Sequence, residues 1–147
     1  MPAPYALDTN VYIGALRDAA ALARLKRFLL RTGQRIRLNA VVALELRAGA
    51  RTPALERAVA KLVEPHVTRE RIVVPSFEAY LQAGRVIASL ATHEGVMPSA
   101  SFTNDVILAT SCREEGVTLV TGNHRDFAAI QRQLRGFRFE ATDDLIR

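Results

Sequence analysis

The sequence predicts an α/β protein in which helices cover both faces of a parallel sheet. Short apolar segments with strand character alternate with longer segments whose apolar residues recur at helical spacing, and this alternation is typical of that class. The chain has 147 residues, of which 49% are hydrophobic and 24% charged, and this composition suits one compact domain with its own core. We therefore expect a single domain over residues 1–147 and exclude a mainly disordered chain.

The first third of the chain contains two expected strands with a helix between them. Residues 5–7 are apolar and end at Asp8-Thr9-Asn10, a polar cluster that favours a turn or a helix N-cap. From residue 22 to residue 29 the apolar side chains recur at helical spacing, and Gly33 is a C-terminal stop signal. Residues 36–38, with Ile36 and Leu38 apolar, form the second expected strand.

The middle of the chain predicts three helices and one strand. The first helix covers about residues 41–49, and the second begins at the start signal Thr52-Pro53. Residues 71–74 form the third expected strand. Pro75-Ser76 then begins a helix that carries Phe77, Tyr80, Leu81, Gly84 and Ile87.

The last third predicts a loop, two helices and two strands. Residues 95–101 form the loop, and a helix over about 102–115 follows it. Residues 117–120 are the clearest strand, residues 123–130 a short helix, and residues near 137–139 the last strand. In parallel sheets of this kind, ligands bind outside the carboxyl ends of the strands.

The charge balance is basic, with a net charge of +5 and an isoelectric point near 10.1. Only Lys26 and Lys61 are lysines, and the rest of the 20 basic residues are arginines, whose planar guanidinium groups suit phosphate and carboxylate alike. This surplus is compatible with a nucleic-acid partner, and a general preference for arginine in the source genome explains it equally well.

The single cysteine and the hydrophobic pattern indicate a cytoplasmic protein. Cys112 has no partner for a disulfide and forms no thiolate zinc site. The uninterrupted apolar runs are too short to span a membrane, and we expect no membrane association. The first residues lack the basic start of a secretory signal, and Asp8 follows closely.

Three acidic residues stand where the pattern favours apolar ones. Asp8 follows the first strand at the edge where ligands bind. Glu45 lies in an expected helix whose neighbouring side chains on that face are apolar or small: Val41, Val42, Ala48 and Gly49. Asp105 repeats this situation with Leu108, Ala109 and Cys112. A buried carboxylate without partners costs several kcal/mol or becomes protonated.

Each acid also has a simpler structural explanation. Asp8 is a suitable N-cap, Asp105 suits the first turn of a helix, and Glu45 has Arg47 as a possible ion-pair partner. Because all three can converge at one sheet edge, a shared cation explains them better than three separate accidents.

A second polar group follows the strand over residues 117–120. Thr121, Asn123 and Asp126 all lie just beyond its carboxyl end. As structural alternatives, Asn123 is a turn or cap residue and Asp126 is a solvated acid in the first turn of a helix.

The ligand types favour a hard cation. Clustered carboxylates without histidine or cysteine ligands select Mg²⁺ or Mn²⁺ rather than zinc. The histidines share no ligand spacing, and no nucleophilic triad, P-loop or dinucleotide fingerprint is visible. Metal-assisted hydrolysis of a phosphodiester remains, with arginines to hold the backbone.

Four blocks of the sequence resemble, in order, the conserved blocks of PIN-domain proteins. They are Leu7-Asp8-Thr9-Asn10-Val11, Val42-Ala43-Leu44-Glu45-Leu46, Asn104-Asp105-Val106-Ile107-Leu108-Ala109 and Thr121-Gly122-Asn123-His124-Arg125-Asp126-Phe127. Chain length and block order are most similar to the VapC-type toxins of prokaryotic type II toxin–antitoxin pairs. The resemblance covers essentially the whole chain.

The resemblance implies a three-layer α/β/α sandwich with a parallel sheet of about five strands. It also implies Mg²⁺- or Mn²⁺-dependent endoribonuclease activity. Asp8, Asp105 and Glu45 match the metal-binding acids, Glu45 directly or through water, and the hydroxyl of Thr9 matches one that supports the first acid. Asn123 stands where many members carry an acid, so the fourth catalytic residue is either Asn123 or the nearby Asp126.

The resemblance further implies partners. VapC-type toxins cleave RNA, form homodimers, and are inhibited by a cognate antitoxin, through which the complex binds operator DNA.

Two other functions are compatible with the sequence. One is a catalytically weak or inactive PIN module that binds RNA or regulates a partner, and Asn123 is the observation that favours it. The other is a receiver-like phosphoacceptor domain, which is disfavoured because Thr9 and Asn10, and not a second acid, follow Asp8.

Overall fold

The computed structural model describes residues 3–147, which form one five-stranded sheet. The strands are β1 (Tyr5–Leu7), β2 (Ile36–Asn39), β3 (Ile72–Val73), β4 (Thr118–Thr121) and β5 (Phe139–Ala141). Their order across the sheet is β3-β2-β1-β4-β5, and every neighbouring pair is parallel. The predicted parallel α/β sheet is confirmed.

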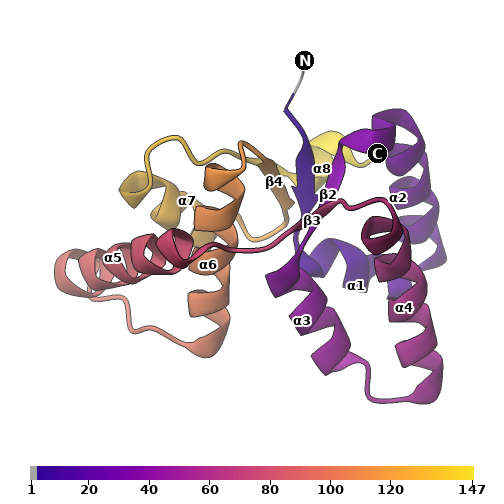
Figure 1. Ribbon diagram of the computed structural model, residues 1–147, viewed down its shortest axis with the longest axis horizontal. Coiled ribbons are helices and arrows are strands. Elements are labelled where there is room, and N and C mark those ends of the chain that lie inside the picture. Colours follow the sequence, from indigo (N-terminus) through magenta and orange to yellow (C-terminus); the bar gives the residue numbers. More distant parts are fainter. Residues whose placement is uncertain (1–2) are drawn as a thin grey trace.

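The helices form two groups on opposite sides of this sheet (Figure 1). One group consists of α1 (Thr9–Arg17), α2 (Ala19–Thr32), α3 (Ala40–Gly49) and α4 (Pro53–Thr68). The other consists of α5 (Phe77–Glu94), α6 (Ala100–Glu114) and α7 (His124–Gln133). A 3-10 turn (Gly33–Arg35) precedes β2, and the short α8 (Thr142–Leu145) follows β5. The layers are those of an α/β/α sandwich.

The core lies on both faces of the central strands. Leu7 of β1 and Leu119 and Val120 of β4 are at most 1% exposed, because helices cover them on either side. All four residues of β4, including Thr118 and Thr121, are buried rather than alternately exposed, as expected for a strand of a parallel sheet. Burial of both faces fixes the strand register, and therefore the positions of the residues that follow each strand.

Most helix starts follow the predicted signals. Thr52 and Ser76 cap α4 and α5 by accepting hydrogen bonds from backbone N–H groups of the first turn, and Gly33 ends α2 with a positive φ of 52°. Within residues 3–147, none of the helices combines the length and the hydrophobicity that crossing a bilayer requires.

Several boundaries differ from the sequence prediction, and the one helix expected between the first two strands is two helices, α1 and α2, because Asp18 caps the second. The helix α6 begins at Ala100, before the expected residue 102, because Ser99 provides the N-cap. The last strand covers Phe139–Ala141 and is displaced toward the C-terminus, since its register is set by pairing with β4. The helix α8 was not predicted, because four residues are too few for a periodic pattern.

Candidate active site

The predicted site residues gather at the carboxyl edge of the sheet. Asp8 directly follows β1, and Thr121 ends the neighbouring strand β4. Asp105 projects from α6 and Glu45 from α3, which belong to the helix groups on opposite sides of the sheet. The site is therefore assembled from segments that are distant in sequence.

Asp8 is a buried carboxylate with several hydrogen-bond donors. It is 5% exposed, and it accepts hydrogen bonds from the backbone N–H of Thr9 at 2.8 Å, the hydroxyl of Thr121 at 2.6 Å and the side-chain amide of Asn10 at 3.2 Å. Burial raises the pKa of Asp8, the charge of Glu45 raises it further, and these hydrogen bonds oppose the shift. The N-cap interpretation of Asp8 is also correct, because Asp8 precedes α1.

Asp105 is the most strongly perturbed acid of the group. It is 8% exposed and extends from a helix whose neighbouring residues Val106, Leu108 and Ala109 are completely buried, so the predicted apolar face is confirmed. Burial raises the pKa of Asp105 to about 7, with further contributions from the negative charges of Asp8, Glu45 and Asp126. These four carboxylates therefore share one electrostatic environment.

Glu45 lies at the border of the buried face of α3, not in its middle. It is half-buried, whereas Val42 and Leu46 are buried and the expected neighbours Ala48 and Gly49 are exposed. The helix rotates these two small residues toward solvent, so the predicted continuous apolar stripe around Glu45 is wrong. The position at the border gives the carboxylate access to both solvent and the site.

The hydroxyl of Thr9 supports Glu45 rather than Asp8. It donates a hydrogen bond to Oε1 of Glu45 at 2.8 Å, while only the backbone N–H of Thr9 supports Asp8. The hydroxyl that supports Asp8 is that of Thr121. This corrects the expected role of Thr9, because a threonine at the first position of α1 directs its side chain toward α3.

Asn123 links two acids. Its side-chain amide donates to Asp105 at 3.4 Å and to Asp126 at 3.1 Å, and its backbone N–H donates to Thr121 at 3.0 Å. Asn123 precedes α7 but makes no side-chain capping bond, so its amide serves the acids instead. The structure therefore places both Asn123 and Asp126 beside Asp105.

An aromatic cluster fixes the position of these two residues. Phe127 is completely buried, and its ring lies 6.0 Å from that of Phe137 and 6.2 Å from that of Phe139, measured between centroids. This packing holds the start of α7 against the end of the sheet.

The sequence analysis did not predict one residue of the site, Asn10. Asn10 was assigned to a turn or helix N-cap and given no role in the site, although its side-chain amide donates a hydrogen bond to Asp8. The Asp-Thr-Asn cluster after a strand was the available signal. Cys112 is completely buried, and burial together with the charge of Asp8 raises the pKa of its thiol to about 12, so it stays protonated at neutral pH.

The donor set fits a hydrated hard cation better than a fully protein-coordinated one. Over residues 3–147, no three Asp, Glu, His or Cys side chains converge closely enough to form a ready-made metal site. Mg²⁺, however, keeps several water ligands and commonly binds through one or two carboxylates. Two buried, oxygen-only donors of raised pKa, with further acids nearby, suit that mode.

The model of the PIN domain family matches residues 5–133, which include every residue of this site. The chain belongs to the PIN-domain family. The predicted resemblance to that family is confirmed. No curated protein sequence matches the chain significantly.

Solved structures that share the fold come from several bacterial complexes. The chain resembles one in the DNA-bound VapBC complex from Salmonella typhimurium, with a TM-score of 0.72 and 22% identity over 95% of this chain and 98% of that chain. For VapBC2 from Rickettsia felis, bound to a promoter DNA fragment, the TM-score is 0.64 and the identity 21%, over 93% and 97% of the two chains. For FitAB bound to IR36 DNA, the values are 0.69 and 19%, over 93% and 94%. At these identities the likeness establishes the shared PIN fold.

Proposed function

We propose that this PIN-domain protein, as a single domain over residues 1–147, is a Mg²⁺- or Mn²⁺-dependent endoribonuclease that acts as the toxin of a VapC-type toxin–antitoxin pair. The observation that carries the proposal is the pair of buried carboxylates, Asp8 and Asp105, at the carboxyl edge of the sheet. Each has a raised pKa, and a cation relieves the repulsion that their ionised forms experience.

Asp8 and Asp105 would hold the metal, and Glu45 would complete the site directly or through water. When bound, such an ion neutralises a phosphate oxygen and lowers the pKa of the attacking water. Thr121 and Thr9 orient Asp8 and Glu45 by the hydrogen bonds described above. Either Asp126 or Asn123 completes the site, and the side-chain amide of Asn123 holds Asp126 next to Asp105.

Two hollows beside the acids suit a bound RNA strand. One, of about 600 Å³, includes Asp126 and is lined by Arg125, Phe102 and Met97, which offer a cation for phosphate and apolar surface for a base. The other, of about 150 Å³, includes Glu45. A strand that crosses the sheet edge between them would pass the acidic residues.

The proposal of an antitoxin and of operator DNA as partners rests on the complexes in which the similar folds occur. Those structures are complexes named VapBC or FitAB, several of them bound to DNA. We propose that a cognate antitoxin covers this acidic site and that operator DNA is bound only through it. RNA cleavage by such a toxin would take place in the cytoplasm.

We also propose that the protein is a homodimer. Phe77, Tyr80 and Leu81 form an apolar stripe on α5 at helical spacing, and they are 78%, 53% and 43% exposed. A second copy of this stripe would bury it, as two-fold interfaces do.

The alternative is a catalytically weak or inactive PIN module that binds RNA or regulates a partner. The amide of Asn123 favours it, because it places a hydrogen-bond donor against Asp105 where an acid would add a metal ligand.

Incubating the purified chain, freed of any antitoxin, with cellular RNA distinguishes the two. A nuclease yields discrete fragments with Mg²⁺ or Mn²⁺ and none with EDTA, whereas the inactive module leaves the RNA intact under both conditions.

A further inference from the structure

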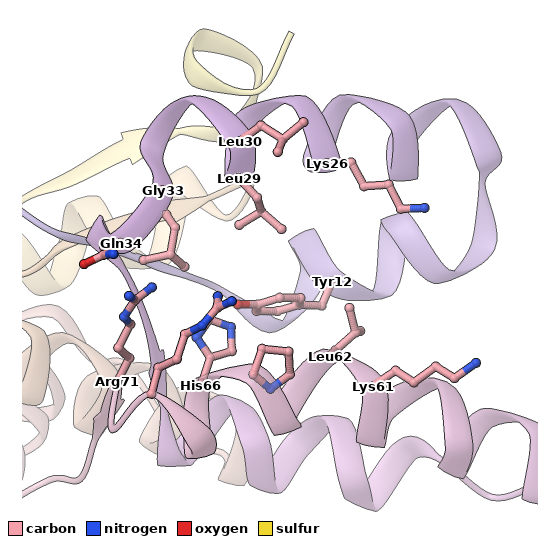
Figure 2. Close-up of a pocket in the computed structure, with 13 residues that line it drawn as sticks. Tyr12, Lys26, Leu29, Leu30, Gly33, Gln34, Lys61, Leu62, His66 and Arg71 are labelled. Carbon is pink, nitrogen blue, oxygen red and sulfur yellow. The ribbon is translucent and has the colours of Figure 1, made fainter.

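A pocket of about 690 Å³ lies between α2 and α4, and none of the acidic site residues lines it (Figure 2). This volume is within the range of small-molecule sites. Its apolar lining comes from both sides and consists of Leu29, Leu30, Ile36, Leu62 and Pro65. Leu30 is 84% exposed, so this apolar surface continues to the rim. The pocket therefore offers contacts to an apolar group.

A buried hydroxyl without a partner lies in this apolar pocket. Tyr12 is 2% exposed, and within residues 3–147 no group forms a hydrogen bond with its hydroxyl. Figure 2 shows the ring of Tyr12 extending into the pocket, with its hydroxyl directed toward the end where His66 and Arg71 lie. A buried polar group without a partner is unfavourable, so a ligand that accepts this hydrogen bond gains free energy on binding.

The rim of the pocket is basic and is not neutralised by acids of the chain. Five positively charged or titratable side chains line it: Lys26, Lys61, His66, Arg69 and Arg71. None of them takes part in the ion pairs found over residues 3–147. Burial lowers the pKa of His66, and the positive charges of Arg71, Arg69 and Arg37 lower it further. An anion entering here meets a positive field.

We propose that this pocket binds a small amphipathic anion, namely an apolar body that carries a carboxylate or phosphate head. The body packs against the apolar lining. The head accepts a hydrogen bond from Tyr12 and is paired by Arg69 and Arg71, whose guanidinium groups suit either head. An RNA backbone crossing the rim would reach the arginines but not the buried hydroxyl. Binding in this pocket does not require ribonuclease activity.

Titration of the full chain with decanoate and with decyl phosphate, each below its micelle concentration, tests this site by calorimetry and amide chemical shifts. We expect saturable binding of at least one of them, with shifts confined to α2, α4 and the start of β2. The tighter of the two identifies the head group. Decanol should bind at least tenfold more weakly, and inorganic phosphate should also bind weakly, because each lacks one half of the ligand.

Variants distinguish specific binding in this pocket from nonspecific binding to the protein surface. Tyr12→Phe should weaken binding about threefold to tenfold, and it should leave the melting temperature unchanged or raised, because it removes a buried hydroxyl without a partner. Arg71→Gln should weaken binding tenfold or more. Arg57→Gln, on the exposed side of α4 and outside the pocket, is the matched control and should bind as the wild type.

Three results would each overturn the proposal. The first is the absence of saturable binding of both anions. The second is an affinity that is unchanged in both Tyr12→Phe and Arg71→Gln, and the third is binding of decanol as tight as that of the anions.

Discussion

The hydroxyl of Thr121 donates a 2.6 Å hydrogen bond to Oδ2 of Asp8, and so ties the end of β4 to the end of β1. Thr121 is completely buried and Asp8 nearly so, and the same hydroxyl accepts a hydrogen bond from the backbone of Asn123. One threonine thus connects the central acid to the loop that carries Asn123 and Asp126. This explains how a site assembled from distant segments is held together by hydrogen bonds.

Thr121→Val should test this connection. The substitution keeps the shape but removes the hydroxyl, so Asp8 loses a donor in a buried position, and we expect a loss of about 1–3 kcal/mol in the free energy of unfolding at pH 8. RNA cleavage should fall about tenfold or more, because Asp8 is no longer oriented. Urea denaturation and initial cleavage rates measure the two effects. Thr121→Ser keeps the hydroxyl and should retain most of both; equal losses in Thr121→Ser and Thr121→Val would refute the role of the hydrogen bond.

The raised pKa of Asp105 predicts that the metal-free protein loses stability as the pH rises from about 4 to about 7. Over this range the unfolded chain has released the proton, near 3.8, while the folded protein retains it up to about 7. Proton binding by Asp105 therefore contributes fully to the free energy of unfolding at acidic pH. This contribution, roughly 2–4 kcal/mol, is lost above neutral pH.

Asp105→Asn should flatten this pH dependence in urea denaturation with EDTA, and Asp144→Asn, on the exposed α8, should not. Saturating Mg²⁺ should also flatten it for the wild type, because a cation favours the ionised carboxylate. Equal pH profiles for Asp105→Asn and the wild type would contradict the raised pKa.

Asn123→Asp should show which residue completes the site. A carboxylate in this position adds a ligand and removes the donor that Asn123 offers to Asp105. Calorimetric titration with Mn²⁺ should then show a severalfold higher affinity, together with lower stability of the metal-free protein. Unchanged affinity, combined with a loss in Asp126→Asn, would instead assign the fourth role to Asp126.

Phe77→Glu should disrupt the proposed dimer. A charge in the apolar stripe of α5 opposes its burial against a second copy, and the exposed position of Phe77 leaves the monomer fold intact. Light scattering coupled to size exclusion should give a dimer for the wild type and a monomer for the variant. Glu78→Gln, in the same turn, is the control. A monomeric wild type at micromolar concentration would contradict the proposal.

Much of the fold was predictable because its signals are local. The apolar strand at 5–7, the Thr52-Pro53 start and the Gly33 stop each act within a few residues. The acids were identifiable for the same reason, since Asp105 interrupts an apolar helix face.

The hydrogen-bond partners were not predictable, because they depend on how distant segments pack. That Thr9 serves Glu45 and Thr121 serves Asp8 follows from the placement of α3 and β4 beside α1 and β1. Thr9 and Glu45 are 36 positions apart in the chain, and Asp8 and Thr121 are 113 positions apart.

The central claim is that Asp8 and Asp105 form the metal-dependent catalytic centre of a ribonuclease. The most direct measurement is the rate of RNA cleavage by the antitoxin-free protein in Mg²⁺ or Mn²⁺, compared with Asp8→Asn, Asp105→Asn and the control Asp144→Asn. We expect a loss of at least a hundredfold in both site variants, with folded spectra, and an unchanged rate in the control. Near-wild-type cleavage by either site variant, or cleavage that persists in EDTA, would contradict the account.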